Sequence, residues 1–402
     1  MQSNNDTVIV AMGRSAIGDF GGALKNLRAH QLGAQMIQGV LAKVPEFDPG
    51  LLDDVILGDC LQCPDEATTA RTTALAAGIP DHVPAVTIQR QCASAMEALA
   101  LASNRIRLGD AELIIAGGVE CMSSAFYCLP AARWGARLRH GVMMDAMWEM
   151  LYSGSTVLDP PGYIMGQTAE NLAHKYKISR EQQDVVALRS HNNAEAAIDQ
   201  GKFKKEIIPI TIARPNKDPL IFETDEHVRR GLTMDDLSRL PPAFAENGTV
   251  TVGNASGIND GAAICLMASR AKARELNLPI LARINAHAVS GCDPRLMGIG
   301  PVPATRKLME KTGVKMTDIE LVELNEAFAV QYIACEKELE LNREITNVNG
   351  SGVGLGHPVG CTGARIVITL LNEMKQRDLT LGLATLCVGG GMGMSMLIEN
   401  AE

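Results

Sequence analysis

An ordered series of apolar strands and amphipathic helices occurs twice along the 402 residues. The pattern at residues 53–57 returns at 318–324, and the apolar run 113–118, which ends in glycines, returns at 383–391. Residues 346–374 likewise repeat the plan of residues 86–109. Strands that alternate with helices are typical of parallel sheets. We therefore predict an α/β fold with two similar halves, built on parallel sheet structure, that face each other.

A more polar and less regular stretch, residues 122–248, interrupts the first half. Within it the sequence predicts helices near residues 168–176 and 179–201, the second opened by a capping box of Ser179 and Gln182. The β-branched residues 249–253 mark the return of regular structure. We expect residues 122–248 to form an inserted lobe over a site. The first half then comprises residues 1–121 and 249–273, and the second comprises residues 274–402.

Charge and composition exclude several classes of protein. The formal charge of −9, from 46 acidic and 37 basic residues, argues against a general nucleic-acid surface but allows a local basic patch for an anionic substrate. The sequence has no apolar run long enough to span a bilayer, and residues 1–10 lack the pattern of a signal peptide. We therefore expect a cytoplasmic protein without a membrane partner, in which the ten cysteines are thiols.

Cys92 lies where a predicted strand, residues 86–91, gives way to a helix that ends at Gly109. Unpaired N–H groups at a helix start favour negative charge. This position is therefore expected to stabilise a thiolate, which is the nucleophilic form of cysteine. A buried cysteine that only fills the core is the alternative interpretation.

Three stretches of the second half offer polar groups that could meet Cys92. Asn325 follows an apolar strand, where it suits either a helix cap or a functional site. The glycine-rich residues 347–363 include His357, a candidate base. Cys387 follows another apolar strand and precedes glycines whose N–H groups suit an oxyanion.

Cys60 and Cys63 form a C-x-x-C motif, a pattern that binds metals or acts as a redox pair in some proteins. The sequence offers no second pair with zinc-like spacing and no histidine in ligand spacing beside this one. We interpret the motif as structural and predict no metal site.

Four blocks together resemble the active-site blocks of the thiolases, the acetyl-CoA acetyltransferases and 3-ketoacyl-CoA thiolases. They are Cys-Ala-Ser at 92–94, Asn-Glu-Ala-Phe-Ala at 325–329, Gly-His-Pro-Val-Gly at 356–360 and Cys-Val-Gly-Gly-Gly-Met-Gly at 387–393. Residues 165–171, 253–261 and 297–304 also resemble this family. The resemblance implies a five-layered αβαβα fold with an inserted loop domain. It also implies an acyltransferase that splits acetoacetyl-CoA or a longer 3-ketoacyl-CoA with CoA, reversibly.

The same resemblance implies a role for each catalytic residue. Cys92 attacks the ketone carbon, His357 takes its proton, and Cys387 moves a proton at the acetyl carbon. His357 with a water held by Asn325 forms one oxyanion site, and the N–H groups of Cys92 and Gly389 form the other. If the two cysteines converge on one carbon, oxidation should bridge their sulfurs.

For the substrate, the resemblance implies CoA and acyl-CoA, with no permanently bound cofactor. CoA would lie under residues 122–248, with Arg229 and Arg230 near its adenosine end and Ser256 at its pantetheine arm. The acyl end would be lined by Met165, Met297, Phe328, Ala327 and Phe244, for which ordinary core packing is the alternative. A homodimer or homotetramer is implied, and residues 133–137 suit tetramer contacts.

Three residues depart from the family pattern. Ala95 stands where the family usually has glycine, and Ser351 stands where a second glycine is common. Ile164 occupies a place that is often histidine in members that handle acetoacetyl-CoA. The loss of that polar group leaves longer or branched acyl chains open as substrates.

Three other functions are weighed against the thiolase interpretation. A decarboxylating ketoacyl synthase shares the fold, but it would use two histidines with its cysteine, where this chain has Asn325 and Cys387. A non-catalytic acyl-CoA or lipid carrier conflicts with the intact Cys92, His357 and Cys387. A zinc or redox protein would rest on Cys60 and Cys63 alone.

Overall fold

A mixed sheet forms the centre of the protein in the computed structural model, which describes residues 4–138, 140–152, 155–158 and 162–401. Within these residues ten strands pair in the order β12-β13-β14-β11-β1-β10-β5-β3-β4, with β2 beside β10. The bounds are β1 Thr7–Arg14, β2 Gly18–Asp19, β3 Asp54–Gly58, β4 Ala85–Ile88, β5 Leu113–Cys121, β10 Asn259–Ser269, β11 Ala282–Gly291, β12 Leu321–Leu324, β13 Leu381–Val388 and β14 Met392–Asn400.

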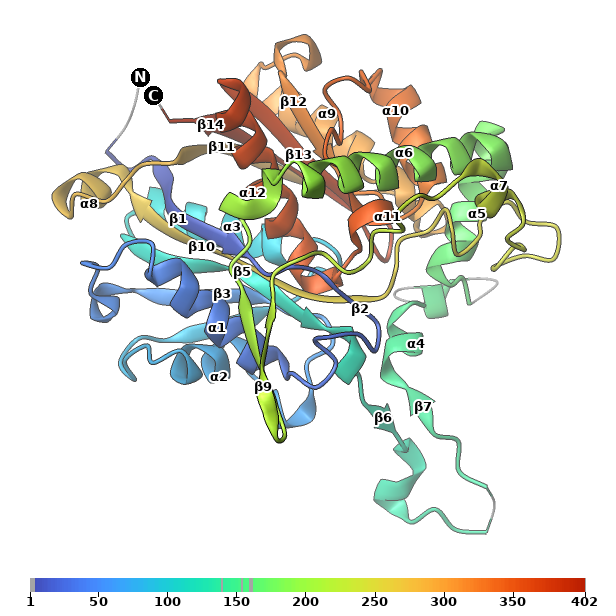
Figure 1. Cartoon of the computed structure of the whole chain (residues 1–402), viewed down its shortest axis with the longest axis horizontal. Helices are drawn as coiled ribbons and strands as arrows, with labels where there is room; N and C mark the ends of the chain where they lie inside the picture. Colours follow the sequence, from blue (N-terminus) through green and yellow to red (C-terminus); the bar gives the residue numbers. More distant parts are fainter. Residues whose placement is uncertain (1–3, 139, 153–154, 159–161, 402) are drawn as a thin grey trace.

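The two halves meet where β1 pairs with β11, at Val8 with Arg283 and Ile9 with Ala282. Helices α3 (Ser94–Leu108) and α12 (Val359–Arg377) pack on each other between the strands of the two halves (Figure 1). The outer faces are covered by α1 (Ala29–Leu41) and α2 (Thr69–Ala76) on one side and by α9 (Pro301–Thr312) and α10 (Ala329–Leu339) on the other. These layers give the αβαβα order expected from the sequence.

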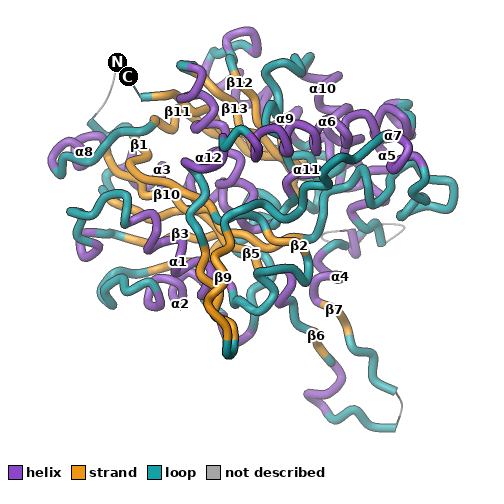
Figure 2. The backbone as a smooth tube through the Cα atoms, viewed as in Figure 1, coloured by secondary structure: helices purple, strands orange, loops and turns teal. Residues whose placement is uncertain are grey.

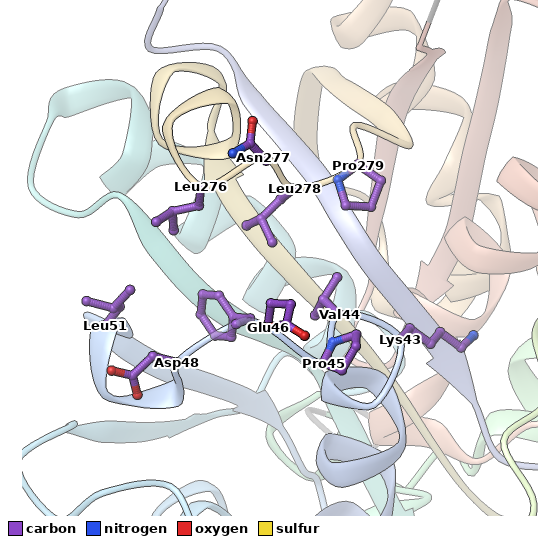
Figure 3. Close-up of a pocket in the computed structure, with 11 residues that line it drawn as sticks. Lys43, Val44, Pro45, Glu46, Asp48, Leu51, Leu276, Asn277, Leu278 and Pro279 are labelled. Atoms are coloured by element: carbon purple, nitrogen blue, oxygen red, sulfur yellow. The ribbon is translucent and has the colours of Figure 1, made fainter.

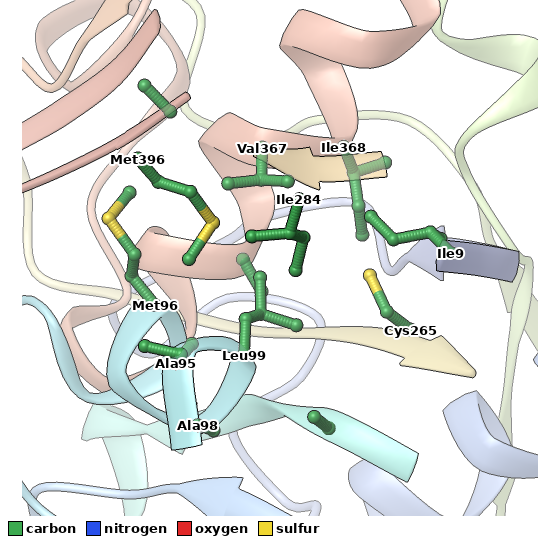
Figure 4. Close-up of a cluster of buried hydrophobic side chains, with 14 of the residues drawn as sticks. Ile9, Ala95, Met96, Ala98, Leu99, Cys265, Ile284, Val367, Ile368 and Met396 are labelled. Carbon is green, nitrogen blue, oxygen red and sulfur yellow. The ribbon is translucent and has the colours of Figure 1, made fainter. Parts of the chain in front are cut away.

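The central layer is buried because α3 and α12 turn small or branched apolar side chains to every neighbour. Figure 4 shows Leu99 of α3 and Val367 of α12 in one cluster with residues from the strands. Leu99 and Val367 are completely buried, as are Ile9 and Ile284 of the two strands that join the halves. The two helices whose N-terminal ends carry Cys92 and His357 are therefore held by one continuous core.

The prediction of a parallel sheet is wrong for the inner strands. β3 runs parallel to β4 and β5, and β12 to β13, but β1, β10, β11 and β14 pair antiparallel. The glycine turn after β13 reverses the chain directly, with φ of +85° at Gly390 and +83° at Gly391. The chain therefore returns as β14, a strand that was not predicted from the sequence.

The described residues between 122 and 248 add no strand to the central sheet. They contain β6 Tyr127–Cys128, β7 Met144–Asp145, α4 Ala146–Met150, α5 Met165–Tyr176, α6 Arg180–Asp199, β8 Ile210–Arg214, β9 Lys217–Phe222 and α7 Met234–Ser238. Figure 2 shows mostly loop in the arm that carries β6 and β7 and projects from the body. The capping box of Ser179 and Gln182 is present at the start of α6. Outside this region, the remaining α-helices of the described residues are α8 Arg270–Glu275 and α11 Gly352–Leu355.

Candidate active site

Cys92 occupies a tight connection between β4 and α3. Gln91 has a φ of +45°, an uncommon value for a residue with a side chain. Its carbonyl oxygen accepts hydrogen bonds from Ser94 N at 2.9 Å and Ser94 Oγ at 2.7 Å. These bonds hold the turn, so the half-buried thiol of Cys92 is presented at the start of α3.

The expected stabilisation of a thiolate at Cys92 is wrong for the protein without substrate. Burial raises the pKa of this thiol to about 11, which outweighs the opposing hydrogen bonds from the N–H groups of Gly389 and Cys92. Helix N–H groups act over a short range, whereas loss of hydration acts on the whole charge. Cys92 therefore rests as a thiol and needs a base.

His357 is buried, and its backbone is fixed on both sides. Gly356 before it has a φ of +100°, and the N–H of His357 donates to Asn259 Oδ1 at 2.8 Å. Its Nδ1 lies 2.6 Å from Thr362 Oγ1, and the Thr362 hydroxyl donates to the Pro358 carbonyl at 2.9 Å. The Thr362 oxygen must then accept from Nδ1–H, which leaves Nε2 unprotonated and able to take a proton.

Burial and the nearby Arg365 guanidinium lower the pKa of His357 to about 3. The imidazole is therefore neutral across the physiological range, as a proton acceptor must be. Arg365 is completely buried, and its Nη1 lies 3.6 Å from Glu323 Oε2. Burial raises the pKa of Glu323 to about 8. Thiol and imidazole are therefore both neutral at rest, with the proton on sulfur, and both line one cavity.

The neutral pair predicts the pH dependence of Cys92 alkylation. A raised thiol pKa and a lowered imidazole pKa both keep these groups uncharged near neutrality. Alkylation by iodoacetamide, assisted by His357, should therefore vary little between about pH 5 and pH 9. In His357→Asn it should be slower and rise about tenfold per pH unit. Mass spectrometry of the Cys92 peptide measures both rates, and a wild-type titration step near pH 7 would contradict the prediction.

Asn325 and Cys387 lie beneath the Cys92–His357 pair. Asn325 follows β12, and its Nδ2 lies 3.5 Å from His357 Nε2, while its buried Oδ1 has no hydrogen-bond partner among the described residues. An unpaired buried amide oxygen suits a bound water. Cys387, near the end of β13, is completely buried, and burial raises its pKa well above the ordinary value; a charge on Cys92 would raise it further.

A cavity of about 550 Å³ opens over Cys92 and His357. Every substrate residue predicted from the sequence lines it, except Arg230, which pairs with Glu195 and Asp199. The residues that the structure brings together here are Met165, Arg229, Phe244, Ser256, Met297, Ala327 and Phe328. Phe244 and Phe328 meet edge to face, with ring centroids 6.2 Å apart. Asn325, Cys387 and Gly389 lie behind the lining.

A polar cluster on this cavity was not predicted from the sequence. Asp19 Oδ1 lies 2.5 Å from His227 Nδ1, and Asp19 Oδ2 lies 3.2 Å from Arg229 Nη2. The bond to His227 lowers the pKa of Asp19. Apolar residues were missed as well: Phe20, Met122, Met147, Trp148, Leu151, Val252, Ile258 and Val359. Asp19 and His227 are 208 residues apart in the chain, so no local pattern links them.

Two of the three unusual residues have clear packing partners. Ala95 packs against Gly118, where an added Cβ would lie 2.7 Å from the Ala95 methyl group. Ser351 gives the buried Arg365 a hydroxyl partner at 3.4 Å. Ile164 is buried and lines the cavity.

Cys60 and Cys63 are both engaged with backbone carbonyls. The thiol of Cys60 donates to Gln91 O at 3.2 Å, and that of Cys63 to Ser124 O at 3.5 Å. Among the described residues, no group of three or more His, Cys, Asp or Glu side chains is arranged to hold a metal ion.

A second cavity, of about 300 Å³, lies beside the connection between the two halves (Figure 3). Its lining is largely apolar and includes Val44, Pro45, Leu276 and Leu278. Lys43 points away from these side chains, and its Nζ is bonded to the carbonyl oxygens of Met12 and Lys205. No predicted site residue lines this cavity. Within the described residues no helix is long and apolar enough to cross a membrane.

Comparison with known proteins gives matches along nearly the whole chain. The model described as "Thiolase, N-terminal domain" matches residues 7–271, and that described as "Thiolase, C-terminal domain" matches residues 278–400. An acetyl-CoA acetyltransferase of Pseudomonas aeruginosa is 46% identical, over 98% of this chain and 99% of its own.

Two solved structures show the same fold. The Bacillus anthracis acetyl-CoA acetyltransferase superposes with a TM-score of 0.95 at 52% identity, covering 98% of this chain and 99% of its own. Human mitochondrial 3-ketoacyl-CoA thiolase in complex with CoA gives a TM-score of 0.93 at 40% identity, covering 99% of this chain and 98% of its own.

Proposed function

This chain belongs to the thiolase family, and from that premise we propose that it transfers acyl groups between CoA thioesters through Cys92, with reversible Claisen cleavage of 3-ketoacyl-CoA. One observation carries the proposal: a thiol and an unprotonated imidazole nitrogen lie on one deep, mostly apolar cavity with a cation near its edge. A carrier would not need a nucleophile paired with a base. A synthase with two catalytic histidines is not supported, because Asn325 stands where such an enzyme would have its second histidine.

The proposed first step is nucleophilic attack by Cys92 on the ketone carbon of the substrate. The sulfur bonds to carbon as its proton moves to Nε2 of His357, which the contact with Thr362 leaves free to accept it. The carbon–carbon bond then breaks and leaves the acyl group on sulfur. Cys387 protonates the acetyl-CoA enolate at carbon. The CoA thiol then attacks the acyl carbon and gives its proton to the Cys387 thiolate, while Cys92 leaves and takes back the proton held by His357.

Two oxyanion sites support this sequence. The N–H groups of Cys92 and Gly389 are directed at the Cys92 sulfur, so they suit the oxygen of the tetrahedral intermediate. His357 Nε2, once protonated, and a water on Asn325 suit the oxygen of the enolate.

We propose that residues 122–248 cover CoA, which acts as a substrate and not as a permanently bound cofactor. The same proposal assigns residues 1–121 and 249–273 to the first half of the protein and residues 274–402 to the second half. Support comes from the cavity wall, to which this region contributes Met147, Trp148, Met165, Arg229 and Phe244. Arg229 is largely exposed, which suits the anionic end of CoA, and Ser256 suits its pantetheine arm. The human relative bound to CoA adds support.

The test of this function is thiolysis across acyl chain lengths. Acetoacetyl-CoA and 3-ketoacyl-CoA of six to sixteen carbons are mixed with CoA and purified protein, and loss of the ketoacyl thioester is followed. We expect activity that does not fall on going from four to six carbons, because Ile164 makes the wall near Met165 apolar. Ile164→His should shift the preference toward acetoacetyl-CoA. Folded, reduced protein that cleaves none of these substrates would refute the function.

We further propose a cytoplasmic homodimer or homotetramer. The arm around β6 and β7, which projects from the body in Figure 1, supports an assembly. It exposes large apolar side chains, including Tyr127, Trp134 and Val142. Residues 133–137 suit contacts within a tetramer. Light scattering of the purified protein distinguishes the two assemblies, and a monomer would refute both.

A further inference from the structure

Glu120 is a completely buried carboxyl group that joins two loops of the site. Its Oε2 accepts hydrogen bonds from Gly360 N at 2.7 Å and Cys60 N at 3.2 Å. Its Oε1 accepts a third bond from Leu61 N at 3.1 Å. Gly360 lies three residues after His357, whereas Cys60 and Leu61 follow β3. One side chain therefore ties the loop of His357 to the first half of the chain.

The connection continues from Cys60 to the nucleophile. The Cys60 thiol lies 3.2 Å from Gln91 O and 3.3 Å from Ser94 Oγ, and these two residues flank Cys92 closely. On the other side, Gly360 allows the close contact, because an added Cβ would lie 2.8 Å from Glu120 Oε2. A continuous chain of hydrogen bonds thus runs from the His357 loop through Glu120 to the turn that presents Cys92.

A second buried carboxyl group, Asp59, lies against Glu120. Its Oδ2 accepts from Thr69 Oγ1 at 2.5 Å, while its Oδ1 has no partner among the recorded hydrogen bonds of the described residues. Burial raises the pKa of Glu120 above its ordinary range and that of Asp59 to about 6, and the charge of Asp59 raises the pKa of Glu120 further. Two buried carboxyl groups this close disfavour simultaneous ionisation.

We propose that Glu120, through its three bonds to backbone N–H groups, is a positioning residue that holds the His357 loop and the Cys92 turn at the separation that proton transfer requires. Neither carboxyl group lines the substrate cavity, so neither is expected to touch substrate. The catalytic meaning of this inference rests on the proposed function. Proton transfer depends on hydrogen-bond reach, and a misplacement of about 1 Å can cost about 100-fold in rate.

The test separates the position of the carboxyl group from its charge. Glu120→Asp keeps the charge but is one methylene shorter, so it cannot reach both loops. Glu120→Gln loses the charge and the acceptor for Leu61 N, but it keeps the length and an oxygen for Gly360 and Cys60, so the tie between the two loops remains. We expect Glu120→Asp to slow Cys92 alkylation at pH 7 by about tenfold or more, toward the rate of His357→Asn. Glu120→Gln should stay within about threefold of wild type.

Thiolysis should follow the same order, with Glu120→Asp lowering kcat while KM for CoA stays within about threefold. The matched control is Asp54→Asn. Asp54 is a buried carboxyl group at the far end of β3 that pairs with Arg105, so its substitution should change neither rate. If Glu120→Asp does not fold, Gly360→Ala repeats the test, because its added Cβ would lie 2.8 Å from Glu120 Oε2 and push the His357 loop away from the first half.

Two outcomes would overturn the inference. Slow Glu120→Gln with normal Glu120→Asp would show that the charge matters and not the position. Variants with lower melting temperatures but wild-type alkylation profiles would show a purely structural role. Alkylation needs no substrate, so a wild-type protein that alkylates as expected but does not cleave 3-ketoacyl-CoA would refute the proposed function and leave this inference standing.

Discussion

Cys92→Ala should abolish thiolysis and prevent any acyl group from remaining on the protein. The thiol is the nucleophile in the proposed sequence, and the described residues of the cavity wall include no other cysteine. Loss of a nucleophile removes the covalent route entirely, so we expect a fall of at least about 1000-fold in kcat/KM. Mass spectrometry after mixing with acetyl-CoA should show one added acetyl group on wild-type protein and none on the variant.

The control for this variant is Cys128→Ala, which removes another half-buried thiol, on β6 outside the cavity lining. It should keep wild-type activity and acetylation. Because alanine is small and helix-compatible, Cys92→Ala should fold normally, which circular dichroism checks. A Cys92→Ala protein that retained more than about a tenth of the activity would show that acyl transfer does not pass through this sulfur.

The positions of the proposed catalytic residues could be predicted from the sequence because each lies near a strand or helix end. Cys92 precedes α3, Asn325 follows β12, and Cys387 lies near the end of β13. Such positions have a local sequence signature, which is an apolar run followed by glycine or a polar residue. The topology places Cys92 and His357 on the wall of one cavity, with Asn325 beside His357.

The features that could not be predicted from the sequence depend on long-range contacts and on burial. The contact of Asp19 with His227 and that of Glu120 with Gly360 join residues more than 200 positions apart. The high pKa of Cys92 follows from dehydration, which only the packed structure defines. Residues 249–253 look like a strand, yet they form a loop, in which the N–H groups of Thr249 and Val250 donate to the Glu170 carboxylate and Val252, on the cavity wall, is 71% exposed.

Cys387→Ser should separate carbon–carbon chemistry from acyl transfer. Serine has nearly the shape of cysteine, but its hydroxyl is a much weaker acid, so it cannot supply a proton to the enolate carbon. We expect cleavage of acetoacetyl-CoA to fall by about 100-fold or more, the scale of general acid catalysis. Exchange of the acetyl group between acetyl-CoA and labelled CoA needs only Cys92 and His357, and should stay within about tenfold of wild type.

The electrostatics of the two sulfurs explain why these steps can be separated. A charge on Cys92 raises the pKa of Cys387, so Cys387 gives up its proton less readily while Cys92 is a thiolate. Acylation removes that charge, which makes Cys387 a better acid in the intermediate that follows. Cys335→Ser changes another buried thiol, on α10 and in the same core cluster as Cys387. It is the matched control and should leave both reactions unchanged. Equal loss of cleavage and exchange in Cys387→Ser would assign Cys387 to support of Cys92 instead of to proton transfer.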